Sequence, residues 1–384
     1  MTNNPIAPPR KKNKKTKSPS LSSIPDDVIV NVLARISKSH YRSLCLVSKN
    51  FNSLLSSPNI YFARSLIGNI EARLYVGLWL PNPSSYHSWF TLHFRQGQLS
   101  FKPVQFSLRP VRLSSSYSPD RLNSTTVAVH SEIYQIGGSN EDKRTRAVRV
   151  LDCRSHTWRR APDMKVARKH ARSYFLDEKI YVIGGCTETK EYLTSWGEVF
   201  DLKTQTWKPL PKPPSDDDVQ LYKSVVCGGR LYAFTMNNNN KNYAYDPNEE
   251  KWVQEAGFVG LGRINGPWCV IGSAIFAERD RTFMWCDPRN GKWSVVYGLY
   301  HIYLERANNY ITIQLVNHDG KLVIIWHQWN WRYKEYTSIW CAVISLEERL
   351  SPSSDLWGKV ERCNVVLGSV HTSVKLSRCL SVSV

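Results

Sequence analysis

The residues best suited to chemistry in this chain are its cysteines, its histidines and one run of aspartates. Nine cysteines are present, and no two stand at C-x-x-C spacing. A structural zinc site needs clustered cysteine or histidine ligands, and none of the ten histidines has a ligand-like neighbour. The run Asp216-Asp217-Asp218 lacks the further carboxylates and turn glycine of a calcium loop. We therefore expect reduced thiols in an intracellular protein, a solvated acidic loop, and neither a metal nor a cofactor.

A second pattern pairs an aspartate with a tryptophan six residues later, and it occurs four times. The stretches are LDCRSHTW, FDLKTQTW, YDPNEEKW and CDPRNGKW, and their pairs are Asp152–Trp158, Asp201–Trp207, Asp246–Trp252 and Asp287–Trp293. An aspartate side chain can bond the backbone two residues on and so begin a tight turn. The tryptophan would then open the next strand and fill the gap between adjacent sheets. The spacing predicts a structural turn and wedge, repeated along the chain.

The sequence argues against catalytic uses of these motifs. A sialidase-type box needs Ser-x-Asp-x-Gly-x-x-Trp, whereas CDPRNGKW lacks the serine and displaces Gly291 by one position. A copper oxidase needs histidine and tyrosine ligands that converge with a cysteine, and no histidine pair has that context. The glycines of GLGRING (260–266) precede no phosphate-loop lysine with serine or threonine. We expect no catalytic residue and no enzymatic activity.

The chain has 384 residues and a net charge of +19. Six of these charges lie near the N-terminus, at Arg10, Lys11, Lys12, Lys14, Lys15 and Lys17. This Pro/Lys-rich stretch cannot bury a core, so residues 1–20 are expected to be a disordered basic tail. It resembles a nuclear-localisation run, and a solubilising tail explains it equally well. Because neither a membrane span nor a signal peptide is evident, we expect the protein in the nucleus and/or cytoplasm.

Short apolar helices are predicted between residues 21 and 68. Pro25 suits a first helical position, and Asp26 and Asp27 put negative charge at the positive end of the helix dipole. Apolar residues then recur at helical spacing in three segments: Val28, Ile29, Val32, Leu33 and Ile36; Leu44 and Val47; and Phe51, Leu54 and Leu55, before Pro58 ends the last helix. A unit of three short helices struggles to bury enough surface alone. We expect it to pack on the rest of the chain or to keep an apolar face for a partner.

The segment SSIPDDVIVNVLARIS…YRSLCLVSKNFNSLLSSP resembles the F-box family. Ile24-Pro25 stands where the family has Leu-Pro, Phe51 follows Val47-Ser48-Lys49 where the family often has tryptophan, and Leu54-Leu55 closes the motif. No second proline precedes the middle helix. The resemblance implies docking on a Skp-type adaptor. The residues expected to make that contact, or to hold the helices together, are Ile24, Pro25, Val28, Val32, Leu33, Val47, Phe51 and Leu55.

Beyond residue 69, short apolar runs alternate with turns, which is typical of strands. EIYQIGG (132–138) and KIYVIGG (179–185) lie 47 residues apart, and the four repeated tryptophans follow each other at 49, 45 and 41 residues. Periods near 50 residues indicate a propeller. One repeat is predicted to hold four strands: SYFLD, IYVIGG, GEVFDL and TWKPL. A four-stranded sheet cannot bury both faces alone, so the repeats should stack radially.

These repeats resemble the kelch family of β-propellers. The resemblance rests on Gly137-Gly138, Gly184-Gly185, the Asp–Trp spacing, and Met164 with Arg168. With Trp89 in a degenerate first repeat and Trp357 in a last one, about six four-stranded blades are expected, and five or seven stay possible. The chain as a whole resembles the large plant family of F-box/kelch-repeat proteins: a small all-α F-box followed by an all-β kelch-type propeller. The expected boundaries are a basic tail at 1–20, the F-box at 21–68, the propeller at 69–372 and a C-terminal tail at 373–384.

The family resemblance implies a substrate-recognition subunit of an SCF-type (cullin–RING) ubiquitin ligase. The adaptor would link the F-box to the cullin and RING subunits, and the propeller would bind a protein substrate. The alternative is a basic nucleic-acid-binding propeller, which the aromatic residues and the positive charge would favour. The tryptophans fall at repeat positions, however, so blade packing explains them better.

Long loops on a rigid scaffold are where binding residues usually sit. The long loops predicted to share one face are 139–146, 161–170, 186–195, 209–220, 237–242, 255–266, 278–282, 298–309 and 327–335, and the turns opposite are predicted to be short. Lysines and arginines minus aspartates and glutamates sum to only +2 over these nine segments, which disfavours nucleic acid as the ligand. Arg168, Lys169 and His170 are the candidates for substrate contact, although the arginine could instead orient its own loop.

Overall fold

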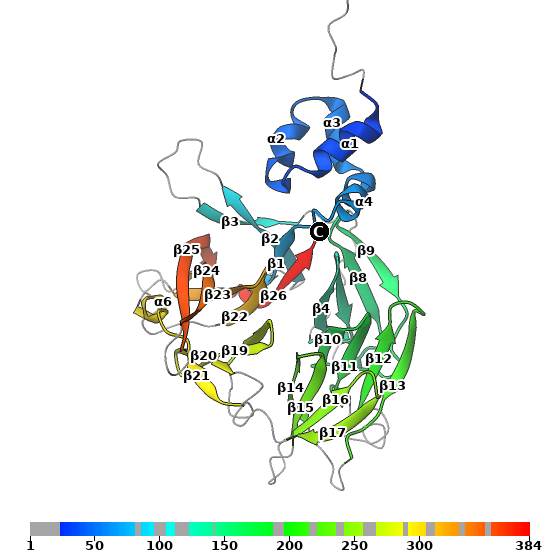
Figure 1. Cartoon of the computed structure of the whole chain (residues 1–384), viewed down its shortest axis with the longest axis vertical. Coiled ribbons are helices and arrows are strands. Elements are labelled where there is room, and N and C mark those ends of the chain that lie inside the picture. The colour runs from blue at the N-terminus through cyan, green and yellow to red at the C-terminus, as the bar shows by residue number, and fades with distance from the viewer. Residues whose placement is uncertain are drawn as a thin grey trace, which may run out of the picture. The chain divides into compact units, whose positions relative to one another are not determined.

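The structure is a computed structural model (Figure 1). It describes residues 24–80, 86–95, 105–111, 123–140, 143–186, 196–214, 221–235, 242–255, 266–286, 291–304, 312–329, 335–349 and 355–384. The chain divides into two compact units, Met1–Ile70 and Glu71–Val384. Among the described residues, no helix combines the length and the apolar character that a membrane crossing requires.

The first unit is helical. Its described elements are α1 (Asp26–Ala34), η2 (Lys38–His40), α2 (Tyr41–Cys45), α3 (Lys49–Ser56) and α4 (Pro58–Leu66). Pro25 is the N-cap of α1 rather than its first residue, and Asp26 and Asp27 lie in the first turn as predicted. Helix α4 is not predicted by the sequence, because Pro58 was expected only to end a helix. Proline also fits the first turn of a helix, and here the hydroxyl of Ser57 accepts the amide of Asn59 at 3.2 Å.

Helix α4 closes the small core of this unit. The buried apolar residues are Ile29, Leu33, Ala34, Leu55 and Ile60. Beside them Arg64 is only 1% exposed. Its guanidinium donates to the carbonyl oxygens of Ala34 and Ile36 at 3.2 and 2.7 Å. Carbonyls at the end of a helix have no intrahelical partner, so Arg64 caps α1 from a helix that lies 30 residues later in the chain.

The second unit is a propeller of six four-stranded antiparallel sheets within the described residues, so the predicted fold is confirmed. In ring order, the first two blades are β26 (Lys375–Ser383), β1 (Ala72–Leu80), β2 (Tyr86–Arg95) and β3 (Gln105–Pro110), and then β4 (Thr125–Val129), β5 (Glu132–Ile136), β8 (Val148–Asp152) and β9 (Thr157–Ala161). The third and fourth blades are β10 (Arg172–Leu176), β11 (Lys179–Ile183), β12 (Gly197–Asp201) and β13 (Thr206–Leu210), and then β14 (Leu221–Cys227), β15 (Arg230–Thr235), β16 (Asn242–Asp246) and β17 (Lys251–Glu255). The last two blades are β18 (Trp268–Ile271), β19 (Ala274–Arg279), β20 (Thr282–Cys286) and β21 (Trp293–Val295), and then β22 (Ile313–His318), β23 (Lys321–Trp329), β24 (Tyr336–Arg349) and β25 (Asp355–His371). The short strands β6 (Ser139–Asn140) and β7 (Lys143–Arg144) and the helix α6 (Tyr300–Leu304) lie between them in sequence.

The two ends of this unit meet in one blade. Strand β26 pairs antiparallel with β1, for example Tyr75 with Leu380, and Glu71 and Val384 exchange backbone hydrogen bonds of 2.9 and 3.2 Å (Figure 1). The expectation of a C-terminal tail at 373–384 is therefore wrong. Without β26 the strand β1 would present an unpaired edge, and strand pairing satisfies those backbone groups.

The repeated aspartates make the turns that their spacing predicts. The carboxylates of Asp152, Asp201 and Asp246 each accept the amide two residues on, at 2.9, 2.8 and 3.0 Å. The fourth aspartate, Asp287, lies outside the described residues. The turn prediction is confirmed for the first three repeats.

The wedge prediction holds fully for two of the four tryptophans. Trp207 and Trp252 are 5% and 8% exposed. Trp207 packs with residues of its own blade and of the preceding one, among them Phe200 and Val148. Trp158 and Trp293 are half-buried. The core of the propeller thus lies between adjacent blades, where the repeated tryptophans add to it.

Candidate functional site

Part of the apolar face of helix α1 is open. Val28 and Val32, one helical turn apart, are 47% and 56% exposed, and Ile24 just before the helix is exposed too. Leu46 and Val47, between α2 and α3, are also exposed, Leu46 to 85%. The Asn50 side chain donates to Asp26 at 3.0 Å and so ties the start of α3 to the start of α1. We call Ile24, Val28, Val32, Leu46 and Val47 the α1 surface.

The structure sorts the eight predicted adaptor residues into two groups. Ile24, Pro25, Val28, Val32 and Val47 are exposed, and can touch a partner. Leu33 and Leu55 are buried at 2% and 5% exposure, and Phe51 is half-buried against the same core. These three hold the helices together. Sequence reasoning missed Leu46, although it directly precedes the predicted Val47.

A second exposed apolar pair lies on α4. Phe62 and Leu66, spaced i, i+4, are 67% and 71% exposed, while Ile60 and Arg64 on the same helix are buried. The sequence prediction could not find this pair because it did not predict α4.

Arg168, predicted to touch substrate, is instead completely buried. Its side chain donates to Glu198 Oε1 from Nε and Nη2 at 3.3 and 3.2 Å, and to the carbonyl of Gly184 at 2.8 Å. Its carbonyl accepts the amide of Gly138 at 2.8 Å. Arg168 therefore fixes the 161–170 loop between two blades, and the prediction of substrate contact is wrong for this residue.

The close approach of the 161–170 loop requires a glycine at position 137, the first of the pair Gly137-Gly138. It has a φ of 65°, and a Cβ on it would lie 2.5 Å from the Arg168 carbonyl oxygen. Any side chain would therefore push the loop away. Glu198, which sequence reasoning missed, also accepts the amides of Lys165 and Val166 at 2.7 and 3.0 Å. The glycine and the buried acid act together to shape the loop.

The next two candidates keep solvent contact. Lys169 is half-buried and donates its amide to the carbonyl of Gly185 at 2.8 Å. His170 is exposed and has a φ of 57°, with its amide bonded to the carbonyl of Asn123. Both backbones are fixed while the side chains face outward or lie at the surface, so both stay predictions for substrate contact.

The predicted long-loop face needs corrections. The segment 278–282 is not a long loop. Arg279 pairs with Thr282, so the turn consists of Asp280 and Arg281 alone, with φ values of 50° and 63°. On the opposite side, residues 96–104 separate β2 from β3, so that connection is not short. The segment 298–309 holds the helix α6. The segment 139–146 holds the short strands β6 and β7, and residues 327–329 belong to β23. The remaining segments stay predictions as long loops.

The first strands of the blades carry basic residues without acidic ones. These six strands (β4, β10, β14, β18, β22 and β26) contain Arg172, Lys223, Lys375 and Arg378 and no aspartate or glutamate. Arg172 and Lys223 both lie over the Trp268 ring, at 5.4 and 5.2 Å from its centroid. Burial, with Arg172 nearby, lowers the pKa of Lys223 to about 8. The positive charge that the loops lack is thus partly on the inner strands, where sequence reasoning did not look.

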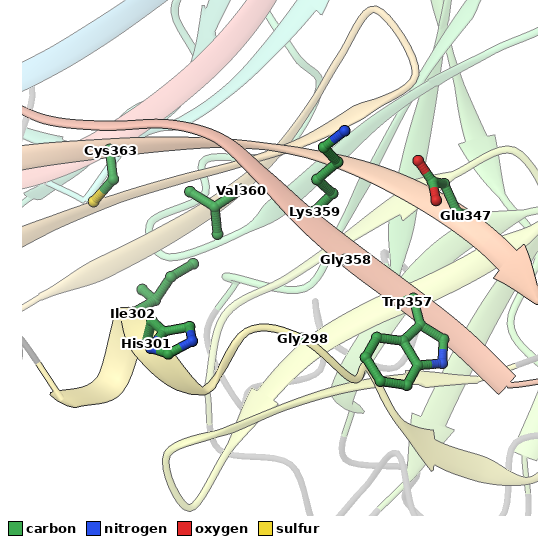
Figure 2. Close-up of a pocket in the computed structure, with 9 residues that line it drawn as sticks. All are labelled: Gly298, His301, Ile302, Glu347, Trp357, Gly358, Lys359, Val360 and Cys363. Carbon is green, nitrogen blue, oxygen red and sulfur yellow. The ribbon is translucent and has the colours of Figure 1, made fainter.

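A pocket of about 450 Å³ opens at the outer edge of the last blade. Figure 2 shows His301 and Ile302 of α6 on one side and Trp357, Lys359, Val360 and Cys363 of β25 on the other. Glu347 of β24 and the backbones of Gly298 and Gly358 complete its wall.

The described residues contain no cluster suited to binding a metal ion, and two of their buried cysteines are poorly suited to nucleophilic chemistry. No three His, Cys, Asp or Glu side chains within them could share a metal ion. Burial raises the pKa of Cys227 to about 11 and that of Cys153 to about 12. These thiols are therefore protonated near neutral pH, and a thiol is a poor nucleophile compared with a thiolate.

Comparison with known proteins agrees with both units. The F-box domain family matches residues 21–63, and the family described as FKB95, Kelch-repeats domain matches residues 89–367. A putative F-box/kelch-repeat protein of Arabidopsis thaliana is 49% identical over 379 residues, which cover 96% of this chain and 94% of that protein. A second F-box/kelch-repeat protein of this plant is 38% identical over 98% of each chain, and a third is 36% identical over 100% of this chain and 97% of its own length.

Proposed function

Because this chain belongs to the F-box/kelch-repeat family, we propose that it is a substrate-recognition subunit of an SCF-type ubiquitin ligase. The observation that carries the proposal is the α1 surface, an exposed set of large apolar side chains on a unit with a very small core. Exposed apolar patches on small units mark interaction sites. The partner proposed for this surface is a Skp-type adaptor, which would connect the chain to the cullin and RING subunits.

In this proposal the protein itself breaks and forms no bonds. The propeller binds a protein substrate while the first unit is held by the adaptor. Tethering both raises the effective concentration of the substrate near a ubiquitin-charged enzyme, and that alone accelerates transfer. The buried ion pair of Arg168 and Glu198 supports this role, because it gives the loop carrying Lys169 and His170 a fixed shape.

Adaptor capture tests the proposal. The double variant Val28→Asp/Val32→Asp places two carboxylates on the α1 surface. Binding of the adaptor would remove water from these carboxylates, and that cost opposes binding. We expect capture of a purified Skp-type adaptor to fall about tenfold or more. The double variant Ile24→Ala/Pro25→Ala should also abolish co-purification. Val253→Asp is the matched control, because Val253 is 50% exposed but lies on β17 of the propeller. Unchanged capture by both double variants would refute the adaptor assignment.

The substrate side is tested separately, by proximity labelling from the intact protein in cells. Proteins whose labelling depends on the propeller are compared between wild type, Lys169→Ala/His170→Ala, and a chain with 187–195 exchanged for a Gly/Ser linker. The 139–146 loop is a poorer target for exchange, since the carbonyl of Thr145 accepts the amide of Arg168 at 3.2 Å. A labelling profile that both changes leave intact would place substrate binding elsewhere on the propeller.

A further inference from the structure

The outer edge of the last blade already pairs with one extended residue of this chain. Strand β25 is the last strand of its sheet. The amide of Tyr297 donates to the carbonyl of Leu356 at 2.9 Å, and the amide of Gly358 donates to the carbonyl of Tyr297 at 2.8 Å. The Tyr297 and Trp357 rings stack with centroids 5.5 Å apart. This edge of β25 can therefore accept a further strand.

The pairing stops after a single residue because the chain turns away. Gly298 has a φ of 80°, and a Cβ on it would lie 2.6 Å from the carbonyl oxygen of Gly358. The chain then enters α6. In an antiparallel pair, successive residues bond alternately to the partner strand and to the outer side. The β24–β25 register is continuous from Asp355 to Val360. Since Leu356 and Gly358 face the outer edge, the N–H and C=O of Val360 face it too.

The pocket lies next to this part of the edge. Ile302 is 3% exposed, and with the half-buried Val360 and Cys363 it provides an apolar floor. The exposed side chains of Glu347, Lys359 and His301 also line the pocket; Figure 2 shows His301 beside Ile302, and Lys359 and Glu347 beyond Val360. Its volume of about 450 Å³ lies within the range of pockets that bind ligands.

We propose that Val360 and this pocket bind an extended segment of a protein substrate. The segment adds as a strand outside β25, exchanges hydrogen bonds with the backbone of Val360, and places an apolar side chain between Ile302 and Cys363. In such strand addition the backbone bonds supply affinity and the side-chain pocket supplies specificity. Because the rim carries both Glu347 and Lys359, the residues flanking the apolar anchor are polar and of either charge. This inference rests on the proposed function only in taking the ligand to be a substrate.

A single substitution at Val360 can remove the hydrogen bond to the ligand while leaving the fold of the blade intact. Val360→Pro removes an N–H that points outward, and proline is tolerated on edge strands when its missing N–H faces away from the sheet. The outer strand β13 already holds a proline, Pro209, two residues after Trp207. Gln254→Pro is the matched control, because Gln254 stands two residues after Trp252 on the outer strand β17.

The experiment pans a phage-displayed library of random peptides on the full-length wild-type chain. Recovered sequences are then synthesised and their Kd values measured. We expect peptides with one apolar anchor that bind wild type and Gln254→Pro equally and bind Val360→Pro at least about tenfold more weakly. The weaker binding follows because Val360→Pro removes the N–H that bonds the peptide and places a proline ring in its path. Recovery of no peptide with that preference, or equal Kd values for all three proteins, overturns the proposal.

A measurement on the unaltered protein guards against a misfolded variant. Bound peptide should slow alkylation of Cys363 in the pocket and leave Cys186, also half-buried but in another blade, unchanged. Peptides that protect neither cysteine, or both equally, overturn the proposal. Adaptor capture by the same preparations reports separately on the proposed function, because Val360→Pro leaves the α1 surface intact.

Discussion

Arg168 and Glu198 form an ion pair with their side chains 0% and 2% exposed, and 3.2 Å separates Nη2 from Oε1. The arginine belongs to the loop that leads into β10, and the glutamate to β12 of the same blade. Removing both charges from water is costly, and hydrogen bonds must satisfy what the pair does not. Here Gly184 and the amides of Lys165 and Val166 supply them. The pair therefore fixes the loop that carries Lys169 and His170.

A double-mutant cycle on this pair tests that role. Arg168→Met leaves the Glu198 carboxylate buried without its partner, and we expect it to lower the free energy of unfolding by about 3–5 kcal/mol. The double variant Arg168→Met/Glu198→Gln should lose clearly less than the sum of the two single variants, because no lone charge is left. Denaturant unfolding at neutral pH measures all four proteins. Additive losses would show that the two side chains stabilise the loop independently.

The repeated tryptophans are expected to differ in their contribution to stability. Trp207 donates to the carbonyl of Pro162 at 2.8 Å, and Trp252 to that of Pro211 at 2.7 Å, in each case just after the last strand of the preceding blade. Truncation of either to alanine should lower the free energy of unfolding by about 3–5 kcal/mol. Trp158→Ala should be milder, because that side chain is half-buried. Thermal unfolding of the three variants decides this, and an equal loss in all three would contradict the burial argument.

The sequence predicts those features that arise within a few residues. Asp201 and Trp207 lie in one hairpin, so their spacing indicates the turn, and the repetition of that spacing along the chain indicates that Trp207 packs against the preceding blade. The closing strand β26 is different, since the Ser377 hydroxyl bonds the carbonyl of Gly77, 300 residues away. Glu198 is similar, because its partner lies in another segment and a single acid in a strand carries no local signal. Both were missed because their contacts join segments that are distant in the sequence, across the whole propeller for β26 and within one blade for Glu198.

The apolar pattern of α1 also shows a limit of sequence reasoning. Periodicity predicts that Val32 and Leu33 share an apolar arc, and it gives no reason to separate them. In the structure Leu33 is 2% exposed and Val32 is 56% exposed. How much of the arc is covered depends on where α3 and α4 pack, and α4 was not predicted. The sequence therefore located the candidate adaptor surface but not which of its residues face outward.

Each repeated turn contains one residue in the left-handed region, and a glycine at that position would relieve the backbone strain. Four residues after each aspartate stand His156, Gln205, Glu250 and Gly291, with φ values of 56°, 55°, 52° and 65°. A side chain in this region costs roughly 1–2 kcal/mol, which equals or exceeds the roughly 0.5–1 kcal/mol of conformational entropy that glycine loses on folding. Glu250→Gly should therefore be at least as stable as wild type. The adjacent Glu249→Gly is the matched control and should be less stable than Glu250→Gly by about 1 kcal/mol. The reverse order in urea unfolding would contradict this.

Acid should destabilise the propeller through His327, which is 0% exposed on β23. One ring nitrogen, Nδ1, lies 2.8 Å from the Thr312 hydroxyl, and burial lowers the pKa of His327 from 6.5 to about 4. The unfolded chain therefore binds a proton that the folded chain does not between about pH 6.5 and pH 4. Folding stability from this residue is complete above pH 6.5 and is lost as the pH falls through that window, on the order of 3 kcal/mol in all. His327→Gln should flatten the decline, whereas His301→Gln, at an exposed position, should not. Urea midpoints at pH 7.5, 6, 5 and 4.5, chosen to span the window, compare the three proteins. Parallel declines in all of them would assign the acid sensitivity to other groups.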